Sequence, residues 1–141
     1  MLAESFFDTN ILVYAAYPKA GEEWKRIIAA DLLMEESYAI STQVLIEFIN
    51  STTQKRKPGL PLDAVREWLT DFRAAPVIGA DDVLVMDGLN MAERYKIDFF
   101  DGLIIAAANR AGAKKLYSED LNHGQKYGAV KVINPFKNQP N

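Results

Sequence analysis

The sequence contains no cysteine and a single histidine, His123, which excludes several classes of chemistry. Without cysteine the chain has no disulfide, no thiolate nucleophile and no zinc site with sulfur ligands. One histidine also excludes a zinc centre that is built on several imidazoles. Any metal ion that this chain binds is therefore expected to be a hard cation with oxygen ligands.

Two motifs that bind nucleotide phosphates, GxGxxG and GxxxxGK, are also missing from the sequence. No apolar run approaches the roughly 20 residues of a membrane span, and the first residues do not resemble a secretory signal. We therefore expect a cytoplasmic protein with no membrane contact. The formal net charge of −3 argues mildly against a general nucleic-acid-binding surface, which is usually basic.

What the sequence does contain suits one domain spanning residues 1–141, with 49% hydrophobic and 25% charged residues. Short β-prone segments alternate with longer segments whose apolar residues recur at helical spacing. The predicted strands are residues 5–8, 38–41, 77–78, 115–118 and 130–133. The predicted helices are residues 22–36, 43–55, 62–73, 81–95 and 99–110, with Thr42 and Asp98 as N-caps and Gly112 ending the last helix.

Strands separated by helices predict an α/β fold, here a single-domain α/β/α sandwich with a mostly parallel five-stranded sheet. Ligands of such sheets bind beyond the carboxyl ends of the strands. The acidic residues at that edge are therefore informative. The sequence places Asp8, Glu47, Asp101 and Asp120 there, three of them as single charges within apolar segments.

Each of these acids also has a purely structural interpretation. Asp8 is a suitable N-cap, and Asp101 lies in a first helical turn, where a carboxylate complements the helix dipole. Glu47 suits a solvated stripe, and Asp120 suits a turn. Four carboxylates at one edge, however, repel each other strongly unless a cation lies between them. Mg²⁺ or Mn²⁺ is the simplest answer, and such ions suit phosphoryl chemistry.

Four segments, in this order, resemble the motifs of PIN-domain ribonucleases, and specifically of VapC-type toxins from type II toxin–antitoxin systems. They are FFDTNILVYA, STQVLIEFIN, YKIDFFDGLIIAAA and LYSEDLNHGQ, and together they span nearly the whole chain. The resemblance implies a cytoplasmic endoribonuclease that uses one or two Mg²⁺ ions, with Mn²⁺ as a substitute. It also implies RNA as substrate, products with a 5′-phosphate and a 3′-hydroxyl, a cognate antitoxin and a homodimer.

The same resemblance implies roles for individual residues. Asp8, Glu47, Asp101 and Asp120 would form the catalytic site, in which Asp8, Asp101 and Asp120 are the metal ligands. Glu47 would hold a metal-bound water or a second ion. Asn10 and Ser118 match polar positions that orient the acids.

Several alternatives stay open at this level. Glu119 competes with Asp120, because neighbouring side chains of an extended segment point to opposite faces. Lys55, Arg56 and Lys57 are either a solvated helix end or a contact to the RNA backbone. A receiver-like phosphate-handling signalling domain also gathers acids at a sheet edge, and an inactive PIN-like binding module would keep the fold without the chemistry.

Overall fold

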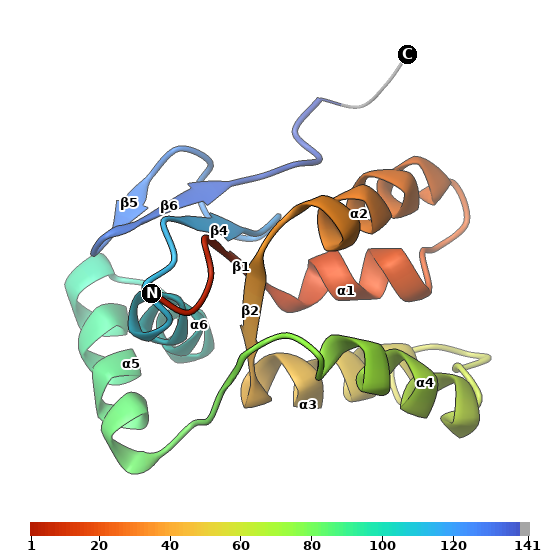
Figure 1. The fold of residues 1–141 in the computed structure, drawn as a ribbon, viewed down its shortest axis with the longest axis horizontal. Coiled ribbons are helices and arrows are strands. Elements are labelled where there is room, and N and C mark those ends of the chain that lie inside the picture. The colour runs from red at the N-terminus through yellow and green to blue at the C-terminus, as the bar shows by residue number, and fades with distance from the viewer. Residues whose placement is uncertain (139–141) are drawn as a thin grey trace.

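The structure is a computed structural model that describes residues 1–138. One sheet lies at its centre (Figure 1), and its strands are in the order β3-β2-β1-β4-β6-β5. The strands are β1 (Ser5–Phe7), β2 (Tyr38–Ser41), β3 (Val77–Ile78), β4 (Lys115–Tyr117), β5 (Lys126–Tyr127) and β6 (Val130–Ile133). The helices are α1 (Thr9–Ala16), α2 (Glu23–Glu35), α3 (Thr42–Thr52), α4 (Leu62–Phe72), α5 (Asp82–Tyr95) and α6 (Phe99–Arg110).

The predicted fold class is confirmed, because every pair of neighbouring strands is parallel except β5 and β6. In Figure 1, α5 and α6 lie on one side of β1 and β2, and α1 to α4 lie on the other. β1 is central, and its Phe6 and Phe7 are fully buried. No helix of residues 1–138 combines the length and apolar character that a membrane span requires.

The predicted strand count was wrong, since residues 1–138 form six strands rather than five. The additional strand, β5, is only two residues long and pairs antiparallel with β6 across a turn at Gly128, whose φ is +62°. Two residues carry no detectable alternation of polar and apolar side chains, so the pattern could not indicate this strand.

The predicted N-cap of α3 was also wrong. Ser41, not Thr42, is the cap, because its Oγ accepts a hydrogen bond from the Val44 backbone N–H at 3.3 Å. Thr42 is already helical. The predicted cap of α6 is confirmed, since Asp98 accepts a hydrogen bond from the Phe100 N–H. Gly112 follows that helix with a φ of +72°, as expected for a residue that ends a helix.

Helix α6 supplies the largest continuous part of the core, since all its residues from 102 to 108 are buried. It packs against α5 at very short range through Gly102. A Cβ atom on Gly102 would lie 2.4 Å from the Gly88 carbonyl oxygen and 2.9 Å from the Ala92 nitrogen. The two helix backbones therefore touch at a point where no side chain fits.

We expect Gly102→Ala to lower the free energy of unfolding by about 1–3 kcal/mol, because the added methyl group pushes two helix backbones apart. A decrease in stability would be informative, since alanine normally stabilises a helix relative to glycine. Urea denaturation measures the change. Gly79→Ala is the control, because its Cβ would have no neighbour within 4 Å; an unchanged or higher stability of Gly102→Ala would contradict the close packing.

Candidate active site

Asp8 follows β1 directly and is nearly inaccessible to solvent, with 4% of its surface exposed. Its Oδ1 accepts a hydrogen bond from the Thr9 N–H at 2.8 Å, so it is the N-cap of α1. Its Oδ2 accepts a second hydrogen bond, at 2.7 Å, from the Ser118 hydroxyl beyond β4. The capping role and the placement at the sheet edge are thus both correct, because the two carboxylate oxygens have different partners.

Glu47 lies in the second turn of α3 and is held by two donors. The Thr9 hydroxyl donates to its Oε2 at 2.8 Å, and Gln43 Nε2 donates to its Oε1 at 2.8 Å. Gln43 Nε2 also donates to the Phe100 carbonyl at 3.0 Å, which ties α3 to the start of α6. The sequence analysis overlooked Thr9 and Gln43. For Gln43 a signal existed, since residues four apart on a helix share a face.

Asp101 lies in the first turn of α6, three residues after the capping Asp98. Burial raises the pKa of the Asp101 carboxyl, and the negative charges of Asp98, Asp120 and Glu47 raise it further. Within residues 1–138, no hydrogen-bond donor reaches this carboxylate. Its interactions with the surrounding groups are therefore dominated by repulsion.

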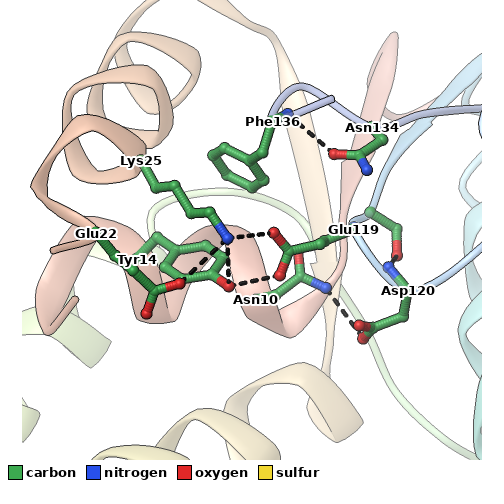
Figure 2. A network of polar contacts seen from close by, with 9 residues as sticks. Asn10, Tyr14, Glu22, Lys25, Glu119, Asp120, Asn134 and Phe136 are labelled. Carbon is green, nitrogen blue, oxygen red and sulfur yellow. Dashed lines mark hydrogen bonds and ion pairs between the residues drawn. The ribbon is translucent and has the colours of Figure 1, made fainter. Parts of the chain in front are cut away.

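Asp120 and Glu119 point in different directions after β4, as the extended backbone suggests (Figure 2). Asn10 Nδ2 donates to Asp120 Oδ2 at 3.1 Å, and the Asp120 N–H donates to Ser118 Oγ at 3.1 Å. Glu119 instead contacts Tyr14 and Lys25. Asn10 and Ser118 thus touch the acids beside which the sequence places them.

These four acids line one pocket of about 420 Å³. It lies between α1, α3, the start of α6 and the segment after β4. Uncharged polar and aromatic side chains complete much of its wall, among them Asn10, Tyr14, Tyr17, Gln43 and Phe100. The pocket therefore brings together Asp8, Glu47, Asp101 and Asp120, which are up to 112 residues apart in the chain.

The three basic residues proposed from the sequence are placed differently. Lys55 and Arg56 line the pocket, together with Lys19, whereas Lys57 does not. The Arg56 guanidinium stacks on the Tyr17 ring, 3.9 Å from its centroid, and donates to the Tyr17 carbonyl at 2.6 Å. Arg56 is therefore engaged in holding the loop after α1, and the two lysines are the more available cations at the mouth of the pocket.

Burial raises the pKa of the Asp8 carboxyl to about 7, although the hydrogen bonds from Ser118 and Thr9 act in the opposite direction. The negative charges of Asp120 and Glu47 raise it further. A neighbouring cation would have the opposite effect, because it stabilises the ionised form. The pocket is therefore electrostatically suited to a cation.

The carboxylates of this pocket would offer an ion oxygen ligands, which suit Mg²⁺ or Mn²⁺. No three His, Asp or Glu side chains in the described part of the chain lie close enough together to hold one metal ion directly. This arrangement is compatible with Mg²⁺, which usually binds through one or two carboxylates and keeps several of its waters. Asp101, which no hydrogen-bond donor of residues 1–138 reaches, would gain most from such an ion.

The raised pKa of Asp8 predicts how stability depends on pH in the presence of a chelator. The folded protein keeps the Asp8 proton up to about pH 7, whereas the ordinary value is 3.8, so folding takes up a proton between these limits. The contribution of Asp8 to the free energy of unfolding should therefore fall as pH rises from about 4 to 7, by at least about 1 kcal/mol.

Asp8→Asn should flatten this pH dependence and be more stable than the wild type at pH 8, because asparagine carries no charge to bury. Urea denaturation at pH 5 and pH 8 provides the comparison, with the exposed Asp63→Asn as control. Equal pH dependence in wild type and Asp8→Asn would contradict the assignment of this effect to Asp8.

The PIN domain model matches residues 5–128 of this chain. The fold is similar to that of a toxin–antitoxin complex from Klebsiella pneumoniae, at 16% identity and a TM-score of 0.70, covering 94% of this chain and 98% of the other. It is also similar to VapC20 of Mycobacterium tuberculosis, a sarcin-ricin loop cleaving toxin, at 18% identity and a TM-score of 0.66, covering 82% and 89%.

A third similar structure is VapBC2 from Rickettsia felis bound to a DNA fragment from its promoter, at 20% identity and a TM-score of 0.61, covering 92% of this chain and 97% of the other. A search of curated proteins found no match. These structural likenesses establish a shared fold, and the PIN domain model matches most of the sequence. This chain therefore belongs to the PIN domain family.

Proposed function

We propose that this protein is a Mg²⁺-dependent endoribonuclease, with Mn²⁺ as a substitute, that hydrolyses RNA phosphodiester bonds. One observation carries the proposal: four carboxylates from different parts of the chain, Asp8, Glu47, Asp101 and Asp120, line a single pocket at the carboxyl edge of the sheet. Such a group suits metal-assisted attack of water on phosphorus, in which the protein supplies no nucleophile of its own.

In this proposal Asp8, Asp101 and Asp120 hold the cation, directly or through water. One or two ions would supply an activated water and neutralise charge on the phosphate. Glu47, whose oxygens are oriented by Thr9 and Gln43, would hold the attacking water through a remaining lone pair. Attack of that water with departure of the 3′ oxygen leaves a 5′-phosphate and a 3′-hydroxyl.

Lys55 is a candidate contact to the RNA backbone, because it is exposed and lines the pocket. Arg56 would contribute mainly by holding the loop after α1, through its bond to the Tyr17 carbonyl. Lys57, outside the pocket, is at most a more distant contact. Phosphates beside the scissile bond would thus meet positive charge, whereas the scissile phosphate meets the metal site.

We further propose that residues 1–141 form one domain that acts in the cytoplasm as the homodimeric toxin of a toxin–antitoxin pair. Support comes from the similar structures, which are named as a toxin–antitoxin complex, a VapC toxin and a VapBC pair. A receiver-like domain is a weaker candidate, since it would need adjacent acids after the first strand, whereas Asp8 is followed by Thr9 and Asn10. An inactive PIN-like module is also a weaker candidate, because clustered carboxylates repel each other and are typical of functional sites.

Cleavage should require added Mg²⁺ or Mn²⁺, and Asp8→Asn should lower the rate at least about 100-fold, because it removes a proposed ligand of the metal ion. Fluorescent RNA oligonucleotides report cleavage, and circular dichroism checks that the variant is folded. Asp63→Asn should cleave like the wild type. Full activity of Asp8→Asn, or of the wild type in chelator, would refute the nuclease assignment.

Metal binding should be visible without RNA. Mn²⁺ should raise the melting temperature of the wild type, since an ion that binds only the native state stabilises it. Asp101→Asn should need a higher Mn²⁺ concentration for the same increase, because one carboxylate of the pocket is lost. Differential scanning fluorimetry measures both curves, and identical curves would place the ion elsewhere.

A further inference from the structure

A polar network surrounds Lys25 of α2 (Figure 2), and two of its members, Tyr14 and Glu22, line the pocket. Its Nζ lies 2.7 Å from Glu119 Oε2, 3.1 Å from Glu22 Oε2 and 3.2 Å from the Tyr14 hydroxyl. An ammonium group has three N–H donors, and here each has a partner. Lys25 therefore has no donor left for a substrate phosphate, and it does not line the pocket.

Aromatic rings shield this network from water. Lys25 Nζ lies 4.6 Å from the centroid of the Tyr14 ring and 5.6 Å from that of Phe136, whose ring packs edge-on against Tyr14. Only 15% of the Lys25 side chain is exposed. An ion pair in such surroundings is screened less than a surface pair, so the contact between Lys25 and Glu119 holds its geometry firmly.

The segment that leads to Phe136 is itself anchored. The Asn134 N–H donates to His123 Nδ1 at 3.0 Å, and the Phe136 N–H donates to Asn134 Oδ1 at 2.9 Å. The single histidine of the chain thus acts in positioning the aromatic cover. The network is built from α1, α2, the segment after β4 and the residues after β6.

Glu119 directly precedes Asp120, and the segment 118–120 is held at every residue. Ser118 Oγ donates to Asp8, and the Tyr14 hydroxyl donates to Glu119 Oε1 at 2.5 Å. Asn10 accepts from the Glu119 N–H at 3.3 Å and donates to Asp120 Oδ2. Asn10 and Tyr14 are one helical turn apart on α1, so one face of that helix holds both acids.

Resting on the proposed function, we propose that Lys25 is a positioning residue for the metal site, which acts by holding Glu119 away from the pocket. Adjacent side chains of an extended segment point to opposite sides. With Glu119 bound to Lys25 and Tyr14, Asp120 faces the pocket. Without Lys25, the Glu119 carboxylate loses its countercharge beside aromatic rings, leaves the network and shifts Asp120 with it.

The first test observes the segment directly. In ¹⁵N-resolved NMR spectra without metal, Lys25→Met should move the side-chain amide signals of Asn10, because its bond to Asp120 is disturbed. Arg26→Met is the matched control, since Arg26 neighbours Lys25 but pairs with Glu23 on the exposed side of α2. Unchanged Asn10 signals in Lys25→Met would overturn the proposal.

The second test measures the consequence for metal binding. The Mn²⁺ concentration at half-maximal thermal stabilisation should rise about 10-fold in Lys25→Met, the size of effect typical of residues that orient metal ligands. Glu119→Gln should act in the same direction, and it leaves Lys25 paired with Glu22, so the test does not depend on the folding of Lys25→Met. The double variant should bind Mn²⁺ no more weakly than Lys25→Met, because both substitutions break the same contact between Lys25 and Glu119.

Tighter or unchanged Mn²⁺ binding in Lys25→Met would overturn the proposal. So would a raised KM for RNA with an unchanged Mn²⁺ midpoint, which would make Lys25 a substrate contact. At saturating Mn²⁺, the kcat of Lys25→Met should return towards that of the wild type. If Mn²⁺ fails to stabilise the wild type, the proposed function is refuted, and the NMR comparison still decides whether Lys25 positions Asp120.

Discussion

The burial of the Asp8 carboxylate at the end of the central strand is the constraint on which the rest of the site depends. A buried carboxylate needs hydrogen-bond donors or a proton. Its donors are the first N–H of α1 and a hydroxyl from the segment after β4. Strand β4 must therefore lie beside β1, as the parallel register of Phe7 with Tyr117 places it. The strand order and the geometry of the site therefore both follow from the need to provide Asp8 with hydrogen-bond donors.

Helix α1 transmits this constraint to the other acids. Thr9, in its first turn, holds Glu47 of α3, while Asn10 holds Asp120 and Tyr14 holds Glu119. Eight residues of helix thus organise carboxylates that the chain supplies from distant segments. Because Asp8 caps this same helix, a shift of Asp8 would also displace the carboxylates that α1 holds. Rigid elements of this kind keep catalytic groups within the narrow tolerance that chemistry requires.

The sequence predicted those parts of the protein that depend on local pattern. Helical and strand periodicity located the sheet edge, and with it Asp8, Glu47, Asp101 and Asp120 in one place. The partners of these acids depend on contacts between residues such as Thr9 and Glu47, which are 38 positions apart. No local pattern encodes such a pair. Strand β5 and the cap at Ser41 were not predicted, because each depends on one or two residues whose alternatives are nearly equal in propensity.

The negative charges of the site lower the stability of the fold, and the same charges favour the cation that the proposed chemistry needs. Asp8 and Glu47 have donors on both oxygens, and Asp120 has Asn10, but Asp101 meets mainly other acids. Lys25 neutralises Glu119 and Glu22, of which only Glu22 lines the pocket, and Lys25 itself does not line it. The acidic wall thus keeps an unbalanced negative charge, which lowers stability and raises the affinity for a cation. A lysine side chain placed among these acids would relieve their repulsion, but it would occupy the place that the metal ion needs.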